Sequence, residues 1–477
     1  MLTQISSRTL LVEELAAELE RPGPSLIVLT ARAADDPWKI VRAALASERP
    51  MRAGIDLAWT AIHTGSRLQR QAMAASLQAE VDRGSSPIPH DDPLGSEDTG
   101  PFVAAARVLA SRIPVRLSLY GAEQLLADPE TAQNLRALWS LARGSALPLH
   151  LILVVEDRVA EATALEALQP HELSAARLCL PLLSLHDLAR ALPGWNSDRI
   201  VSGRALLGGD AAVWSRVDPR ASLSTNVCRL ILSPDGPLFD RGWNRLAIGV
   251  QKPERYAEVL HAVAAGARDW GSIVAGSPAF TSASQLGPYM RQLESDGQVS
   301  AQRSLDAGPR SRRTRYRMVD SHQAFWFKHL LPLRSRLLSG SDPREIWRTD
   351  IRPRVRAFVG EQVPALLQAE IELEPVLGVR AREVGALWNE GCDFPVAGTL
   401  ETGAVFYGRT WWADTPSAGV LEQMRTEMRE TRYGFGRESR WRMLFVRLDP
   451  DHNWERQVAR TADARFIGVD DVVGRSP

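Results

Sequence analysis

The stretch 256–327 constrains the fold of this chain most. Residues 256–266 carry apolar side chains at helical spacing and end on a glycine, which predicts a helix. A short helix over 272–275 and a third over 283–295, with Thr281 and Ser282 as caps, should follow. Two short polar strands within 299–317, joined by a loop at 307–309, complete the pattern. Three helices followed by a β-hairpin predict a winged helix-turn-helix.

Ahead of this module, apolar runs alternate with helical patterns. Continuous apolar runs over 25–30, 115–120 and 149–156 are typical of strands buried in a parallel sheet, and 54–59 and 178–182 are further strand candidates. Helices are expected at 11–20, 38–47, 68–81, 102–112, 129–141 and 185–192, with a surface loop over 83–100. The alternation predicts an α/β fold with a parallel, doubly wound sheet. We interpret the turn at Gly208-Gly209 as a bend between two helices.

Composition places the chain among globular proteins of several domains. Its 477 residues are 44% hydrophobic and 24% charged, with a formal net charge of +0, so affinity for nucleic acid must come from a local patch. The three cysteines, Cys179, Cys228 and Cys392, are far apart in the sequence. This spacing argues against a disulfide framework or a zinc site and favours a reducing cytoplasm. No apolar run reaches the ~18 residues of a membrane span, and the N-terminus does not resemble a signal peptide.

Nucleotide binding depends on the loop after the first strand. A P-loop needs glycines to wrap the phosphates, a lysine and a Ser or Thr. The segment 30–37 (TARAADDP) has neither glycine nor lysine, and the carboxylates of Asp35 and Asp36 would repel phosphates. After 115–120, where an ATPase places Asp and Glu, stand Gly121 and Ala122, and we interpret Lys39 and Glu123 as ordinary surface charges. We expect no ATP hydrolysis and no bound cofactor. The degenerate loop positions are Thr30, Ala31, Asp35 and Asp36.

Several short motifs carry a resemblance to a known family. They are Gly208-Gly209, 256–260 (YAEVL) with Ala265-Gly266, 286–293 (LGPYMRQL), and 316–320 (YRMVD) with 325–327 (FWF). In this order they resemble the archaeal-type ATPases, a branch of the AAA+/STAND P-loop class that carries a winged helix and a restriction-endonuclease-like domain. The resemblance spans nearly the whole chain. It departs from the family at the catalytic positions: the GRRxxGKT loop is absent, and Val155-Glu156 replace the polar sensor.

The last third should hold the nuclease-like fold that the resemblance implies. Helices are expected over 322–338, 354–369 and 418–431, and strands over 383–388, 392–400, 404–407 and 442–448. In related nucleases an Asp and a Glu-x-Lys hold a divalent ion. Asp393 matches the Asp, but Arg409-Thr410-Trp411 replace Glu-x-Lys, and Val363-Pro364 stand near the expected upstream acid. We therefore predict no nuclease activity and no metal, with Asp393 as a turn or capping residue and Trp411-Trp412 as packing residues.

DNA binding is the positive expectation, although arginine is common throughout the chain, with further basic runs at 334–336 and 352–356. A basic hairpin beside a helix-turn-helix suits phosphate contacts, although winged helices also serve as protein-docking or lid domains. The third helix offers few side chains that could contact bases. The candidate DNA-binding residues are Gln285, Arg291 and Gln292 on that helix, and Arg303, Arg310, Arg312, Arg313, Arg315 and Arg317 on the hairpin.

We expect four domains. They are a degenerate AAA+/P-loop ATPase-like α/β domain (1–195), a helical lid segment (196–250), a winged helix-turn-helix (251–320) and a degenerate restriction-endonuclease-like α/β domain (321–477). Three hypotheses stay open: a non-catalytic DNA-binding or regulatory subunit, a pseudoenzyme scaffold for a multiprotein complex, and an ATP-binding protein with a non-standard phosphate loop. The expected partners are double-stranded DNA and other proteins, with a homo-oligomer left open and no membrane.

Overall fold

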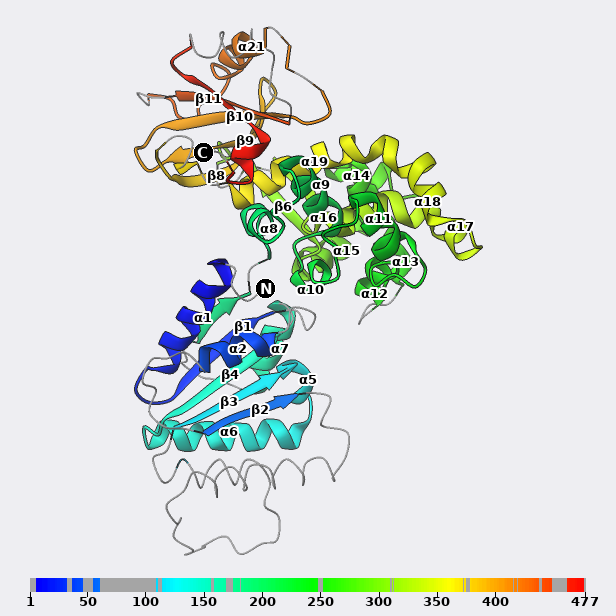
Figure 1. Cartoon of the computed structure of the whole chain (residues 1–477). Helices are drawn as coiled ribbons and strands as arrows, with labels where there is room; N and C mark the ends of the chain where they lie inside the picture. The colour runs from blue at the N-terminus through cyan, green and yellow to red at the C-terminus, as the bar shows by residue number, and fades with distance from the viewer. Residues whose placement is uncertain are drawn as a thin grey trace, which may run out of the picture. The chain divides into compact units, whose positions relative to one another are not determined.

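The structure is a computed structural model that divides into two compact units, Met1–Leu182 and Leu183–Pro477 (Figure 1). The predicted helices at 68–81 and, apart from Leu109, at 102–112, the loop 83–100, and Asp35, Asp36, Glu156, Arg310 and Arg312 lie outside the described residues. The structure describes residues 6–31, 37–45, 55–60, 109, 114–155, 158–168, 175–180, 182–247, 252–308, 311, 313–371, 373, 374, 378–414, 416, 417, 419–436, 440–447 and 461–475.

The first unit is built on the predicted parallel sheet. Its described strands run in the order β2-β3-β4-β1-β5, and every neighbouring pair is parallel. The predictions for β1 and β3 are confirmed residue for residue, those for β2 and β4 differ by at most one residue at either end, and the predicted strand 178–182 overlaps β5 only at residues 178 and 179. The strands are β1 Ser25–Thr30, β2 Ile55–Thr60, β3 Val115–Tyr120, β4 Leu149–Val155 and β5 Ala176–Cys179.

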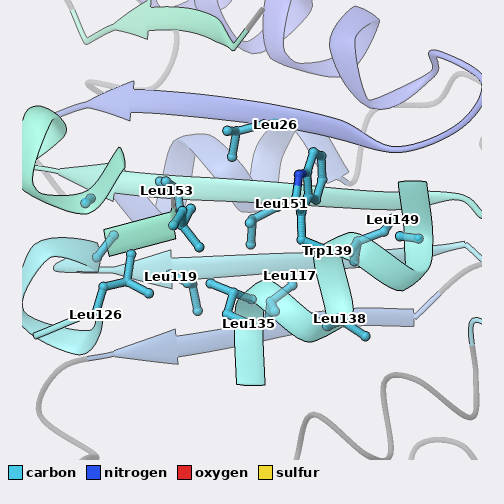
Figure 2. Close-up of a cluster of buried hydrophobic side chains, with 14 of the residues drawn as sticks. Leu26, Leu117, Leu119, Leu126, Leu135, Leu138, Trp139, Leu149, Leu151 and Leu153 are labelled. Atoms are coloured by element: carbon cyan, nitrogen blue, oxygen red, sulfur yellow. The ribbon is translucent and has the colours of Figure 1, made fainter. Parts of the chain in front are cut away.

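Helices cover both faces of this sheet, which makes it doubly wound. Alternate residues of β1 point to opposite faces, as the pleat requires. Leu26 and Val28 pack with helices α5 (Ala122–Leu125), α6 (Pro129–Gly144) and α7 (Arg158–Leu168), and Figure 2 shows leucines from the strands meeting Leu135 and Trp139 of α6. Ile27 and Leu29 pack on the other face with α1 (Ser6–Leu19) and α2 (Pro37–Leu45). Burial on both faces explains why these strands are continuously apolar.

A buried histidine makes the stability of this unit depend on pH. His150 on β4 is 4% exposed, and its Nδ1 lies 2.7 Å from Ser25 Oγ. Burial, with Arg116 adding repulsion, lowers the pKa of His150 from 6.5 to about 4. Below pH ~6.5 the unfolded chain takes up a proton that the folded chain refuses, so stability is lost as pH falls toward 4. We expect the free energy of unfolding to fall by up to about 3 kcal/mol over this window. The substitution His150→Gln should largely abolish this fall. Urea unfolding from pH 7 to 4 measures it, and equal pH dependence in both proteins would contradict it.

The second unit begins with helices α8 (Leu185–Ala191), α9 (Ser197–Leu207), α10 (Ala211–Trp214), α11 (Leu223–Val227) and α12 (Arg241–Ala247). The predicted bend at Gly208-Gly209 is confirmed, because α9 ends at Leu207 and α10 starts at Ala211. Gly208 has φ 77°, a left-handed conformation that disfavours a side chain. The bend lets the Trp214 indole N–H donate to the Gly208 carbonyl at 2.7 Å.

Three π-helical turns interrupt the helices of this unit. They are η4 (Cys228–Leu232), η5 (Trp326–Leu330) and η7 (Trp347–Ile351). A proline stands two residues after each of them, at Pro234, Pro332 and Pro353. Proline has no N–H to donate and its ring clashes with the carbonyl four residues earlier, so a widened turn relieves the conflict. The predicted single helix over 322–338 is therefore a chain of short pieces: α16 (Ser321–Phe325), η5, η6 (Leu331–Leu333) and α17 (Arg334–Leu338).

Three packed helices and a hairpin occupy the middle of the chain, as predicted. The helices are α13 (Pro253–Ala265), α14 (Trp270–Ala275) and α15 (Ala283–Ser295). Strands β6 (Val299–Arg303) and β7 (Thr314–Met318) follow and pair antiparallel. Helix α13 contacts α14, α15 and β7, and α15 contacts β6, so the five elements form one cluster.

The last third of the chain forms a mixed sheet, whose described strands run in the order β12-β11-β10-β9-β8. Strands β8, β9 and β10 are antiparallel neighbours, whereas β10, β11 and β12 are parallel. The sequence predicted four of these strands and missed β12. Around the sheet lie α19 (Arg352–Glu370), α21 (Val420–Glu427) and α23 (Val469–Val472). The strands are β8 Ala381–Trp388, β9 Asp393–Leu400, β10 Val405–Trp411, β11 Arg440–Val446 and β12 Ala464–Ile467.

Candidate nucleic-acid interface and degenerate catalytic positions

At the edge of the first sheet where a nucleotide would bind, the structure describes the chain only as far as Ala31 after β1 and Val155 at the end of β4. Thr30 ends β1, and the buried Ala31 donates its N–H to the Val155 carbonyl at 2.8 Å. After β3, Gly121 takes φ 67° and Ala122 is fully buried in α5. Neither residue offers a carboxylate toward a metal ion or a water molecule.

The structure corrects our interpretation of Glu123 as an ordinary surface charge. It lies in the first turn of α5, is half-buried, and has one carboxylate oxygen shielded from water. The short helix after β3 packs against β4 and α7, and this packing draws the side chain inward. The side chain of Lys39, in α2, lies outside the described residues.

We expect no shift of thermal melting with Mg-ATP. A ligand at ~100 times its dissociation constant would stabilise the folded chain by about 2.7 kcal/mol, an effect that differential scanning fluorimetry detects easily. The physical reason is the missing glycines and lysine of segment 30–37. Mg-GTP and Mg²⁺ alone are the controls. A rise in the melting temperature specific to ATP would show instead a nucleotide site built from other residues.

Asp393, the one carboxylate that matched the nuclease pattern, is neither a turn nor a capping residue, contrary to the prediction. It is the first residue of β9, and its side chain binds Arg315 of the hairpin. Arg315 Nη1 lies 3.0 and 3.1 Å from the two carboxylate oxygens. The same guanidinium lies 4.6 Å from the ring centroid of Trp388 on β8. Arg315 thus neutralises the carboxylate of Asp393.

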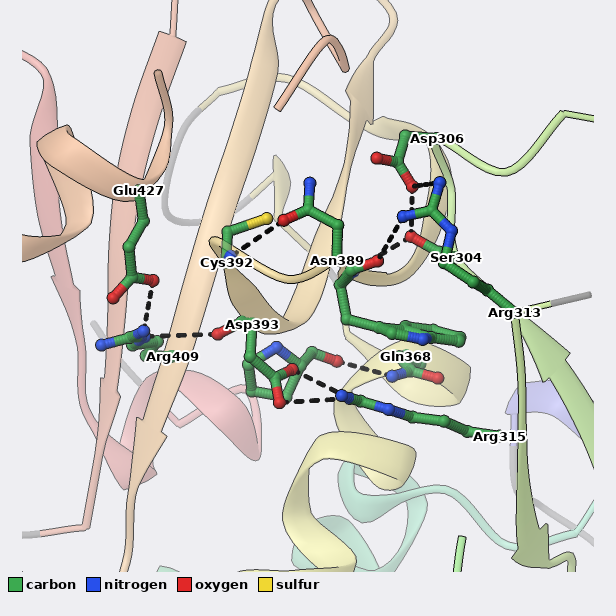
Figure 3. A network of polar contacts seen from close by, with 12 residues as sticks. Ser304, Asp306, Arg313, Arg315, Gln368, Asn389, Cys392, Asp393, Arg409 and Glu427 are labelled. Carbon is green, nitrogen blue, oxygen red and sulfur yellow. Dashed lines mark hydrogen bonds and ion pairs between the residues drawn. The ribbon is translucent and has the colours of Figure 1, made fainter. Parts of the chain in front are cut away.

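The Glu-x-Lys position also carries an internal ion pair. Arg409 on β10 binds the Glu427 carboxylate of α21, and both side chains are mostly buried, at 19% and 14% exposed. Arg409 Nε also donates to the Asp393 carbonyl at 3.3 Å (Figure 3). The arginine therefore stands where a carboxylate would be needed. In the described part of the chain, no three His, Cys, Asp or Glu residues are grouped as a metal ion would require.

The two tryptophans at the end of β10 contribute to packing, as predicted. Trp412 is 3% exposed, and its Cβ would lie 3.2 Å from a methyl group added at Gly360 of α19. Trp411 packs against the buried cluster of the sheet that includes Phe394 and Met424. Trp412 is therefore buried, and Trp411 is partly buried.

Plasmid DNA should stay intact with this protein in the presence of Mg²⁺ or Mn²⁺. The carboxylates of Asp393 and Glu427 are each already paired with an arginine, which lowers their affinity for a divalent cation. Agarose electrophoresis after prolonged incubation measures cutting. Cleavage that disappears in Asp393→Ala would contradict this prediction, whereas cleavage that survives the substitution indicates a contaminating nuclease.

The hairpin is docked against the last sheet through a continuous polar network (Figure 3). Just after β6, the Leu305 N–H donates to the Ala386 carbonyl of β8 at 2.9 Å. The Trp388 N–H donates to Ser304 Oγ at 3.0 Å, and Ser304 donates to Asp306 at 2.5 Å. These contacts fix one side of the hairpin to the edge strand β8, which would otherwise expose unpaired backbone groups. From β6 itself, Gln302 Nε2 donates to Gln368 Oε1 of α19 at 2.7 Å.

The described arginines of the predicted hairpin fall into two groups: three that contact other residues or are partly buried, and one that is exposed without an ion pair. Arg313 donates to the Trp388 carbonyl at 3.3 Å and lies 3.8 Å from Asp306, while Arg315 is held by Asp393. Arg317 is half-buried, with its Nε shielded from water, and burial lowers the pKa of its guanidinium. Only Arg303 is exposed without an ion pair to any described residue.

The third helix, α15, presents a continuous polar face to solvent. Its other face is buried through Leu286, Met290 and Leu293. The Gln285 Oε1 accepts from the Thr281 N–H at 3.1 Å, and Gln292 Nε2 donates to Asp296 at 2.8 Å. The exposed residues on one side of the helix are Ser284, Gln285, Pro288, Arg291, Gln292 and Ser295. The three predicted base-contacting residues thus share one exposed face.

Comparisons with known proteins concern the fold. No family model matches the sequence, and no curated protein is significantly similar to it. Similar solved structures include a Walker-type ATPase of Pyrococcus abyssi, with 13% identity, a TM-score of 0.49, and coverage of 67% of this chain and 95% of that one. The ORC2 protein of Aeropyrum pernix, in ADPNP and ADP complexes, has 13% identity, a TM-score of 0.38, and coverage of 70% and 93%. Cdc6p from Pyrobaculum aerophilum has 12% identity, a TM-score of 0.34, and coverage of 70% and 94%.

With TM-scores below 0.5 and identities of 12–13%, these similarities assign neither a family nor a function to this chain. Among the described residues, no helix combines the length and the apolarity needed to cross a membrane. All three cysteines are free thiols, with Cys179 exposed and Cys228 and Cys392 buried.

Proposed function

We propose that this chain is a non-catalytic DNA-binding or regulatory subunit of AAA+-type descent. In this proposal residues 1–195 are a degenerate ATPase-like domain, 196–250 a helical lid, 251–320 a winged helix-turn-helix and 321–477 a degenerate nuclease-like domain. In this proposal the pairs Arg315–Asp393 and Arg409–Glu427 occupy the positions of lost metal ligands on the last sheet. Segment 30–37 lacks the glycines and the lysine of a phosphate loop.

The observation that carries the proposal is the exposed polar face of α15. A helix that enters the major groove must keep one face free of packing and equip it with donors and acceptors. Gln285 and Gln292 can each give a bidentate contact to adenine, and Arg291 can give one to guanine. Arg303 is exposed on β6, which α15 contacts, and could bind a phosphate.

Fluorescence anisotropy with a labelled duplex tests this proposal. Wild type should bind at low salt, and the triple variant Gln285→Ala, Arg291→Ser, Gln292→Ala should bind at least ten-fold more weakly, because a good base contact contributes about 1–3 kcal/mol. Arg425→Ser, on an exposed helix of the last domain, is the control for loss of one charge. An unchanged affinity in a folded triple variant would remove α15 from the interface.

A scaffold for a multiprotein complex is the second candidate, and Phe435 favours it. This side chain is 82% exposed, although the loop that carries it is held firmly. The Tyr407 hydroxyl donates to the Tyr433 carbonyl at 2.6 Å, and Arg440 donates to the Gly434 carbonyl at 2.9 Å. A fixed, exposed aromatic ring is typical of a protein-binding hot spot. A partner recovered from nuclease-treated lysate by wild type but not by Phe435→Ser would favour the scaffold.

A further inference from the structure

A second group of exposed arginines lies outside α15 and the hairpin. Four exposed arginines follow one another at intervals of four residues along a continuous helix from Pro343 to Glu370, formed by α18 (Pro343–Ile346), η7 and α19. We call them the arginine row: Arg344, Arg348, Arg352 and Arg356.

The π turn η7 keeps the row in line. In a regular α-helix each step of four residues passes a full turn by about 40°, so three steps would rotate the last arginine by about 120° from the first. One extra residue in the turn takes back about 100° of this rotation. Pro353 accounts for the π turn, because it cannot donate to the Thr349 carbonyl and its ring needs space there. The proline thus aligns the side chains on both sides of it.

The charge of the row is largely unbalanced. Residues 344–360 contain five arginines and two acidic residues. Glu345 binds Arg348 at 2.7 Å, in a pair exposed at 52% and 66%, and Asp350 is engaged by Arg336 at 3.1 Å. Arg344, Arg352 and Arg356 form no ion pair with the residues that the structure describes.

Packing does not explain the row. The buried side of the same helix is formed by Ile346, Ile351, Phe358 and Val359. Like charges four residues apart on a helix repel each other and destabilise it. A bound anion would remove this repulsion, and an anion with several regularly spaced charges would remove it along the whole row.

We propose that the arginine row binds the phosphate backbone of duplex DNA. Its guanidinium groups start from Cα atoms about 6 Å apart along the helix axis, a spacing similar to that of successive phosphates on one strand. Arginine binds phosphate in a bidentate manner that lysine cannot match. The row has no amide or aromatic side chain between its arginines on the same line, so it contacts phosphates without reading sequence. The inference extends the proposed function to a second surface and uses none of the α15 or hairpin residues.

Salt-dependent anisotropy with a 30-base-pair duplex tests the row. Arg344, Arg348, Arg352 and Arg356 are replaced together by glutamine, which keeps the stem of the side chain and its helix propensity. We expect at least ten-fold weaker binding, and a plot of log K against log salt that is flatter by about 0.9 for each lost phosphate contact, hence by two to four over the row. The charge-matched control replaces Arg220, Arg380, Arg425 and Arg429, which are also exposed. This control variant should change the slope by less than the value of about 0.9 expected for one phosphate contact.

The outcomes separate this inference from the proposed function. If the row variant keeps the wild-type slope and affinity, the arginine row does not bind DNA, even if the α15 variant loses binding. Loss in the row variant alone supports the row and overturns α15 as the DNA-binding face. No duplex binding by wild type at roughly 50 mM salt overturns both. Displacement of the DNA by polyglutamate at equal charge would assign the row to acidic proteins instead. If the quadruple variant melts early, the pairs Arg344/Arg348 and Arg352/Arg356 are tested separately.

Discussion

Replacing Glu370 by alanine should destabilise the second unit by about 3–5 kcal/mol. Glu370 ends α19, and its Oε1 lies 2.7 Å from Arg204 Nη2 of α9, with the two side chains only 11% and 7% exposed. Its other oxygen accepts the Leu185 N–H at 2.8 Å. Without the carboxylate, the guanidinium stays buried with the Leu183 carbonyl, 3.0 Å from its Nε, as its remaining recorded partner. Leaving one charge of a buried pair uncompensated is the costly way to break it.

Urea unfolding followed by tryptophan fluorescence measures this loss. The matched control is Glu374→Ala, since Glu374 forms an ion pair with Arg380 that is exposed at 54% and 68%. Such an exposed pair contributes about 0–1 kcal/mol. A loss below about 1 kcal/mol in Glu370→Ala, with an unchanged denaturant slope, would show that water reaches Arg204 and that the pair is not essential.

The second large effect should separate the hairpin arginines into two sets. The first set is Arg303, which is exposed without an ion pair to a described residue, together with Arg310 and Arg312, which lie outside the described residues and are included because the sequence predicted them to bind phosphates; we call it the free set. Arg315 and Arg317 form the held set, because Asp393 and burial engage them. Serine at the three free positions should flatten the plot of log K for duplex DNA against log salt by up to about 2.7, at about 0.9 for each phosphate contact.

The held set should behave differently. Arg315→Ser should leave the salt dependence unchanged, but it should loosen the docked hairpin and raise amide hydrogen exchange in β7. A charge-matched variant at Arg380, Arg425 and Arg429 controls for net charge. Equal slope changes from the two sets would mean that DNA displaces Asp393 from Arg315. In that case the hairpin docked against the last sheet is a conformation that does not bind DNA, and the DNA-bound conformation is a different one.

Sequence periodicity predicted the elements whose burial is uniform. Strand β1 is apolar at consecutive positions because helices cover both faces, and helix α15 has one buried stripe. Strand β12 (ARFI) escaped prediction because it has only four residues and its burial is mixed. The burial of Arg442 was not predicted either. This side chain is fully buried within β11, and its charge is compensated by Asp463, which lies 21 residues further along the chain.

The candidate site depended on contacts that no local pattern reveals. Asp393 and Arg315 are 78 residues apart, and Arg409 and Glu427 come from different elements. In the sequence Arg315 was a candidate for phosphate binding, Asp393 was interpreted as a turn or capping residue, and Glu427 gave no signal, since neither motif nor spacing indicates an internal partner. The absence of catalysis stays a prediction, made from the sequence because a missing glycine or carboxylate is visible without any contact. The docking of the hairpin needed the three-dimensional arrangement.

Site-specific photocrosslinking tests the central claim, DNA binding through α15, most directly. A photoreactive phenylalanine analogue is placed at Gln285 or Gln292, both exposed on α15, and at Gln423 on α21 as the matched exposed control. The account predicts that 285 and 292 crosslink to a labelled duplex, that an unlabelled duplex competes, and that 423 does not crosslink. Crosslinking only from 423, or from none of the three positions while the protein binds duplex, would contradict it.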